Sequence, residues 1–215
     1  TFVTPNTEYI IATAQMVAPL GGAYAPLSEY NDKYRGSQIY WKFDRAKGRI
    51  IKEESFALEL PPYMQDLADA GKGPSADWMF WTSYNAERAT GKLEVTASQR
   101  DRDYIAAVDW RAAEKAIAEG KGDVIGGVKV LDPKKVPGIV YLMPCGKSPH
   151  GVDVSPDGKY IIGSGKLQGV TTAFNWEKVQ TAIRNKDFTG DEDGIPVLKY
   201  ESIKDAEVPV GLGPL

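Results

Sequence analysis

The feature that most constrains this chain is an internal repeat that ends a strand and begins a helix. Residues 108–117 (VDWRAAEKAI) parallel residues 174–183 (FNWEKVQTAI), and in both an Asp or Asn precedes a tryptophan. Such an Asx side chain caps a helix by accepting a backbone N–H hydrogen bond. The tryptophan and the last isoleucine are seven residues apart, which places them on one helical face. The repeat predicts equivalent units, each a hairpin followed by a short surface helix.

Turn residues divide the rest of the chain into short apolar runs. The sequence holds 22 glycines and 14 prolines, and residues 5–12 (PNTEYIIA) are echoed by residues 156–163 (PDGKYIIG). Proline at the first turn position, followed by Asx or Gly, leads into a strand. In residues 39–51 apolar residues alternate on both sides of a turn that Gly48 closes, which indicates a hairpin. Repeated hairpins with aromatic and glycine signatures predict an all-β fold, a partial β-propeller of about three to four blades with short surface helices.

Two stretches depart from this rhythm. Residues 60–74 begin with helical spacing and end as a glycine loop, in which Gly71-Lys-Gly73 is interpreted as a flexible turn. Residues 119–136 are charged and rich in glycine, which predicts an exposed connection. No change in composition marks a boundary, so residues 1–215 are predicted to be part of one β-propeller domain.

Composition excludes several classes of protein. The 26 Lys and Arg against 29 Asp and Glu give a net charge of −3, without a basic cluster that would indicate binding to nucleic acid. No apolar run approaches the roughly 18 residues of a membrane span. A single cysteine, Cys145, excludes an internal disulfide. The chain starts with Thr1 and its last residues resemble a turn, so we expect an interior piece of a longer protein.

His150 is the one histidine of the chain, and it lies between Pro149 and Gly151. The proline favours an extended conformation of Ser148 before it, and the glycine removes a Cβ that would crowd whatever the ring faces. Imidazole is the commonest transition-metal ligand, but such sites usually need three or four protein ligands. His150 is therefore either a structural residue or one ligand of a site that other residues complete.

A second candidate is the oxygen-rich stretch of residues 81–103. Hard cations such as Ca²⁺ bind six to eight oxygens from carboxylates, carbonyls and water, and Tyr84, Glu87 and Asp101 could supply several of them. EF-hand spacing is missing, and a solvated loop explains the same residues. Cys145 has no second histidine to activate it as a nucleophile, so a small buried residue is the simpler interpretation.

Three separated motifs, in the family's order, resemble the catalytic propeller of nitrous-oxide reductases. Residues 147–167 (KSPHGVDVSPDGKYIIGSGKL) resemble the segment that carries one histidine of the tetranuclear copper–sulfide centre. Residues 84–88 (YNAER) are similar to the Tyr-Asn-x-Glu element, and residues 211–215 (GLGPL) to a run that leads into another histidine ligand. The similarity covers essentially the whole chain, and it implies part of a seven-bladed propeller from a divergent branch of the family.

The resemblance also assigns roles to particular residues. His150 matches a copper ligand of the cluster. The side chains that match ligands of a structural calcium are Tyr84, Glu87 and Asp101. Val95 stands where many members have a methionine, so only its main-chain carbonyl can contribute to that calcium. Ser148 stands where many members have an asparagine ligand, which leaves a hydroxyl oxygen for that contact.

The activity that the resemblance implies is reduction of N₂O to N₂ and water, with electrons from a c-type cytochrome or a cupredoxin. It further implies a periplasmic homodimer, whose dinuclear copper site lies in a cupredoxin domain that is absent from this chain. On its own the chain is expected to be inactive because it cannot assemble the cluster. One alternative is a non-catalytic β-propeller that serves as a binding scaffold. Another is a quinoprotein-type dehydrogenase, for which the required stacked tryptophans and acidic calcium ligands around a quinone are not evident.

Overall fold

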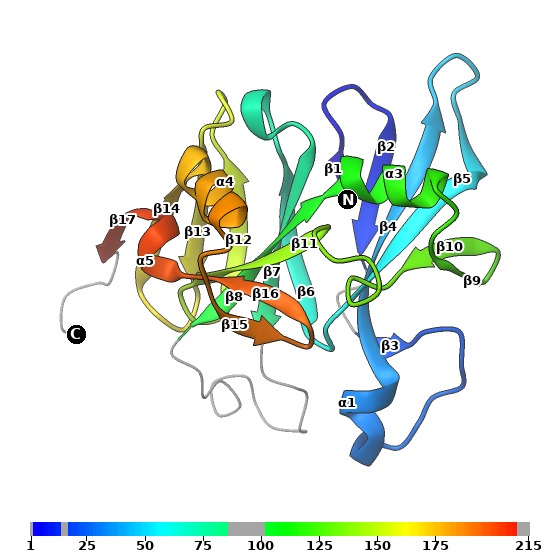
Figure 1. The fold of residues 1–215 in the computed structure, drawn as a ribbon, viewed down its shortest axis with the longest axis horizontal. Helices are drawn as coiled ribbons and strands as arrows, with labels where there is room; N and C mark the ends of the chain where they lie inside the picture. Colours follow the sequence, from blue (N-terminus) through cyan, green and yellow to red (C-terminus); the bar gives the residue numbers. More distant parts are fainter. Residues whose placement is uncertain (1, 14–16, 86–101, 210–215) are drawn as a thin grey trace.

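Three mainly antiparallel sheets lie side by side in the computed structural model, which describes residues 2–13, 17–85 and 102–209 (Figure 1). The first sheet has the order β1 (Phe2–Val3), β2 (Tyr9–Thr13), β4 (Tyr34–Asp44), β5 (Arg49–Leu60), β10 (Val128–Leu131) and β9 (Asp123–Ile125), and β3 (Ala18–Pro19) pairs with β4. The second has the order β15 (Phe188–Glu192), β16 (Ile195–Leu198), β11 (Val140–Cys145), β8 (Asp103–Asp109), β7 (Trp78–Asn85) and β6 (Met64–Ala70). The third has the order β12 (Pro149–Val154), β13 (Tyr160–Gly165), β14 (Val170–Asn175) and β17 (Lys204–Pro209).

Helices in the described ranges are short. They are η1 (Leu27–Glu29), α1 (Tyr30–Lys33), η2 (Gly73–Ser75), α3 (Trp110–Ala118), α4 (Trp176–Asn185) and α5 (Tyr200–Ile203). The all-β class predicted from the sequence is therefore confirmed. Within the described residues each sheet is open, and the arrangement is propeller-like because the first strands of successive sheets meet. Strand β12 packs against β6 and β7, and β1 packs against β6.

The repeated strand-to-helix unit is present as predicted. Asp109 caps α3 by accepting a hydrogen bond from Ala112 N at 2.8 Å, and Asn175 caps α4 by accepting one from Glu177 N at 3.0 Å. Trp110 and Trp176, the first residues of these helices, are buried. Both are packing anchors, and each also donates its indole N–H to the connection between β6 and β7. The acceptors are the carbonyls of Ala76 and Pro74, at 3.2 and 3.1 Å.

The segment after each capped helix reaches back to the preceding sheet. The hairpin β9–β10 follows α3, and β10 pairs in parallel with β5 of the first sheet. The hairpin β15–β16 follows α4, and β16 pairs in parallel with β11 of the second sheet. The prediction that residues 119–136 are only an exposed connection was wrong, because Val128, Val130 and Leu131 are buried in this pairing. Successive sheets are thus held together by exchanged hairpins as well as by side chains.

Strand β6 contradicts the prediction of a helical start in residues 60–74. Register shifts occur between Met64 and Gln65 and between Gln65 and Ala68, where β6 pairs with β7. They bury Gln65 and Ala68, three residues apart, on the same side of an extended strand. This spacing imitates one helical turn, since a β-bulge interrupts the ordinary alternation of a strand.

The second sheet lies between two hydrophobic cores. Adjacent residues of a strand point to opposite faces, and on β7 Trp81 packs in the core shared with the first sheet while Phe80 packs in the core shared with the third. In the first of these cores the rings of Tyr40 and Phe56 stack with centroids 4.8 Å apart. In the second, the Phe80 and Trp176 rings meet edge to face at 5.5 Å. Because both faces of the second sheet are packed, β6 is held between β1 of the first sheet and β12 of the third.

Candidate functional site

His150 is the extra residue of a β-bulge on β12, the first strand of the third sheet. Pro149 pairs with Gly165 and Gly151 pairs with Ser164, so His150 is inserted between two successive pairs of the ladder. A bulge re-aims the side chain at its extra position. The His150 side chain retains 59% of its exposure, whereas the residues on either side of it are buried or half-buried. The local structure therefore presents one imidazole outward from a packed strand.

Ser148, just before the bulge, corrects one expectation. Its φ is +49°, in the left-handed region, instead of the extended conformation predicted from the following proline. Two hydrogen bonds hold it there. Ser148 N donates to Asp103 Oδ2 at 2.5 Å, and Ser148 O accepts from Lys166 N at 3.0 Å. Since Ser148 and Asp103 are both fully buried, the surroundings over-determine a backbone conformation that is otherwise unfavourable.

The imidazole of His150 contacts a carboxylate from the neighbouring sheet. Its Nδ1 lies 2.5 Å from Oδ2 of Asp66 on β6. The Asp66 side chain is only 8% exposed, so it is the fixed member of the pair. The second nitrogen of a metal-binding histidine commonly donates to such an acceptor, which fixes the tautomer and the ring. Nothing in the sequence indicated Asp66, which is 84 positions away.

Further along the same two strands, a second set of contacts fixes their spacing. Asp69 of β6 accepts a hydrogen bond from Val154 N at 2.8 Å and another from Lys72 Nζ at 2.6 Å. Lys72 Nζ also donates to the Val154 carbonyl at 2.8 Å. Strands β6 and β12 belong to different sheets, yet side chains join them near both ends of β12. The position of the His150 ring relative to β6 is consequently well defined.

The predicted calcium ligands remain a prediction, because most of them are not among the described residues. Glu87, Val95 and Asp101 lie outside the described residues, and so does the side chain of Tyr84, whose backbone belongs to β7. Ser148 is described, and it is bound to Asp103 at the start of β8. Next to Asp103, Ser83 of β7 donates its Oγ hydrogen to the carbonyl of Tyr104 on β8 at 2.8 Å.

Across the ranges 2–13, 17–85 and 102–209, no group of three or more His, Cys, Asp or Glu side chains is placed to bind a metal ion. A transition-metal site built from this part alone is therefore not supported. One imidazole does fit as a single contributed ligand. Asp66 engages Nδ1, so Nε2 is the ring nitrogen that would bind a metal, and the ring is more than half exposed.

Cys145 has the structural role that sequence reasoning favoured. Its side chain is fully buried in the core between the second and third sheets. Burial raises the pKa of the Cys145 thiol to about 12, so a reactive thiolate is not formed at neutral pH. Its sulfur lies against Gly163, where an added Cβ would come within 2.7 Å.

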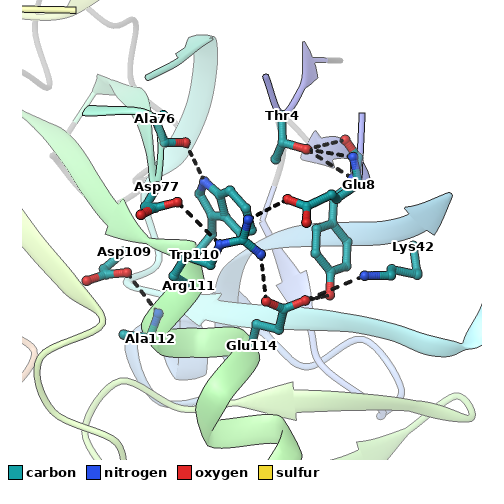
Figure 2. A network of polar contacts seen from close by, with 11 residues as sticks. Thr4, Glu8, Lys42, Ala76, Asp77, Asp109, Trp110, Arg111, Ala112 and Glu114 are labelled. Carbon is teal, nitrogen blue, oxygen red and sulfur yellow. Dashed lines mark hydrogen bonds and ion pairs between the residues drawn. The ribbon is translucent and has the colours of Figure 1, made fainter. Parts of the chain in front are cut away.

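A polar network around Arg111 was missed by sequence reasoning, and Figure 2 shows that it joins the first sheet to α3. Arg111 contacts Glu8 at 2.6 Å and Glu114 at 2.9 Å, and Tyr9 donates its hydroxyl to Glu114 at 2.7 Å. Although burial opposes it, hydrogen bonds from Tyr9 and Arg111 hold the pKa of Glu114 below its ordinary value. The spacing of Arg111 and Glu114 on one helix was a visible signal. The network fastens α3 to the first sheet.

The fold and this site together define a class of protein: an all-β, propeller-like chain that presents one histidine at the junction of two sheets. No protein-family model matches the chain. A solved structure, hydrazine synthase of Kuenenia stuttgartiensis, has a similar fold, with a TM-score of 0.55 at 15% identity over 99% of this chain and 50% of that one.

Sequence comparison shows which known proteins the chain resembles. The chain is 31% identical to nitrous-oxide reductase of Stutzerimonas stutzeri and 30% identical to that of Pseudomonas fluorescens, in each case over 98% of its length. It spans 31% of the length of these relatives. The chain is thus a divergent relative of nitrous-oxide reductase, an oxidoreductase, and it matches about a third of such a protein.

Proposed function

We propose that this chain is part of the catalytic propeller of a nitrous-oxide reductase, which converts N₂O to N₂ and water. Similarity to two such reductases over nearly the whole chain supports the proposal. The observation that carries it is the single histidine, aimed by a bulge and held by a carboxylate of the next sheet. In this proposal residues 1–215 belong to one propeller domain and supply about three to four of its seven blades.

His150 is proposed to hold one copper of the copper–sulfide cluster through Nε2. When bound, that cluster supplies the electron-transfer chemistry that breaks the N–O bond. The residues of this chain position one ligand for it. The bulge turns the ring outward, Asp66 engages Nδ1, and the Asp69–Lys72 contacts keep β6 and β12 together. A ligand ring fixed in this way loses little freedom when a metal binds.

We also propose that a calcium ion ties residues 84–101 to the strand that carries His150. Its ligands would be Tyr84, Glu87, Asp101, Ser148 and the main-chain carbonyl of Val95. The support is the motif resemblance together with the place of Ser148. Its N–H binds Asp103, which is two positions beyond Asp101 in the sequence.

The remaining properties concern the complete protein, of which the chain matches only part. We propose a periplasmic homodimer that receives electrons from a c-type cytochrome or a cupredoxin, through a dinuclear copper site in a cupredoxin domain. No helix among the described residues is both long enough and apolar enough to cross a membrane.

The proposed function is tested on the protein encoded by the complete gene. The protein and the Stutzerimonas stutzeri reductase are produced in the same copper-supplied host, and copper per polypeptide and N₂O consumption with a reduced dye are measured for both. We expect copper in both proteins and conversion of N₂O to N₂ by both. A folded, copper-free protein that leaves N₂O unchanged, beside an active control, would favour a non-catalytic propeller scaffold instead.

A further inference from the structure

We propose that Asp66 is a positioning residue that sets the tautomer and the orientation of the His150 ring. In its consequence for copper this inference rests on the proposed function, but its structural part does not. Asp66 touches neither substrate nor any reacting atom. It acts through His150, by accepting a hydrogen bond from Nδ1 and so directing the lone pair of Nε2 away from β6.

The difference in exposure between the two side chains indicates which one controls the other. The His150 side chain is 59% exposed and lies at a bulge, where the ladder does not constrain it. The Asp66 side chain is 8% exposed and comes from a strand that is packed on both sides. A half-exposed imidazole could rotate about its side-chain bonds in the absence of a partner. The 2.5 Å contact with a buried carboxylate selects one of those orientations.

The chemistry of imidazole makes the effect on the tautomer specific. A neutral histidine in water carries its proton mainly on Nε2, which leaves Nδ1 as the basic atom. A carboxylate is an acceptor only, so its contact with Nδ1 requires the proton to be on Nδ1. The contact therefore reverses the ordinary preference and leaves the outward-facing Nε2 unprotonated, which is the form in which a ring nitrogen binds a metal ion.

The neighbouring Asp69 offers a matched comparison. It lies on the same strand and also reaches β12, but it binds Val154 N and Lys72 Nζ instead of the ring. Loss of Asp69 removes a hydrogen bond between the strands and leaves the Asp66–His150 contact in place. Loss of Asp66 removes the contact with the ring and leaves the Asp69 bonds in place. If Asp66 had a merely structural role, loss of Asp66 and loss of Asp69 would have the same effect on the tautomer of the His150 ring.

Because the chain has one histidine, NMR spectroscopy can read this ring without ambiguity. Long-range ¹H–¹⁵N spectra of the ¹⁵N-labelled 215-residue chain are recorded in a pH series and interpreted at its alkaline end, where one ring nitrogen carries the proton. In the original chain we expect the Nδ1–H tautomer to predominate. In Asp66→Ala, which lacks the acceptor at Nδ1, we expect the Nε2–H tautomer to predominate. Asp66→Asn retains an acceptor oxygen and should lie between them, and Asp69→Asn should match the original chain.

Backbone spectra of the same samples show whether each variant is folded. Predominance of the Nε2–H form in the original chain would overturn the proposal, and so would an unchanged tautomer in folded Asp66→Ala. A second measurement separates this inference from the function on which it rests. In the complete protein, Asp66→Ala should lower copper affinity by about 10- to 100-fold. If the tautomer changes as expected while copper content and affinity do not, Asp66 positions the ring but His150 is not a copper ligand, and the proposed function fails at this residue.

Discussion

A Gly158→Ala variant is expected to lose at least about 3 kcal/mol of the free energy of unfolding. Gly158 has a φ of +71°, which costs a residue with a Cβ about 1–2 kcal/mol. A Cβ added there would also lie 1.7 Å from the carbonyl oxygen of Lys72 and 2.4 Å from its carbon. These are backbone atoms, so the overlap cannot be relieved by a side-chain rotation. The turn that holds Gly158 and the loop at Lys72 would have to separate.

Gly48→Ala is the matched control for this prediction. Gly48 also has a positive φ, +60°, but nothing lies within 4 Å of an added Cβ. It should therefore show only the conformational cost, about 1–2 kcal/mol. Urea unfolding of the two variants and the original chain measures both quantities. Equal losses for Gly158→Ala and Gly48→Ala would show that the close approach at Lys72 is not present in solution.

The second large effect is expected from His150→Ala in the complete protein. Removal of residues that only support a metal ligand costs about 10- to 100-fold in affinity or activity, so removal of a ligand itself should lower N₂O turnover by about 100-fold or more. We expect cluster copper to fall in parallel. Stability should change little, since the His150 side chain is 59% exposed. Copper per polypeptide, N₂O consumption and the unfolding midpoint are measured on the same preparations.

Asp153→Ala is the control for the histidine variant. Asp153 lies on β12, three residues beyond His150, and it is also exposed. Its replacement should leave copper content and turnover close to those of the original protein. If His150→Ala retains full copper and activity, His150 is a structural residue. If both variants lose copper equally, the strand matters for assembly and the imidazole has no special role.

Local signals in the sequence were sufficient for the elements that depend on neighbouring residues. Asp109 and Asn175 cap α3 and α4 as predicted, because a cap is formed within a few residues of the helix it begins. The seven-residue spacing placed Trp110 and Trp176 on one face of each helix, and both side chains are buried. The all-β class followed from the regular turns.

Features that depend on distant residues could not be predicted in the same way. The bulges of β6 hide the alternation of a strand, so Gln65 and Ala68 imitate a helix. The left-handed backbone of Ser148 is held by Asp103, which is 45 positions away, and it overrides the preference that a following proline imposes. Close packing at Gly71 was likewise not visible in the sequence, where Gly71-Lys-Gly73 was interpreted as a flexible turn. An added Cβ at Gly71 would lie 1.7 Å from the Ser75 carbonyl oxygen.

In the candidate site, too, the sequence indicated the features that depend on neighbouring residues but not those that depend on distant ones. The histidine at the bulge was recognisable as a candidate because its signals, the surrounding Pro149 and Gly151, are adjacent to it. Its carboxylate partner could not be identified from the sequence, since Asp66 reaches the ring only through the packing of two sheets. Of the calcium ligands proposed from the motif, Ser148 lies in a described and buried position. The others remain predictions.

The most direct test of the central claim is copper-edge anomalous scattering from crystals of the complete, copper-loaded protein. We predict an anomalous peak at bonding distance from Nε2 of His150, about 2.0 Å, with Nδ1 still engaged by Asp66. Copper peaks elsewhere, with the His150 ring unliganded or turned into the packing between β12 and β6, would contradict the assignment of this histidine as a copper ligand.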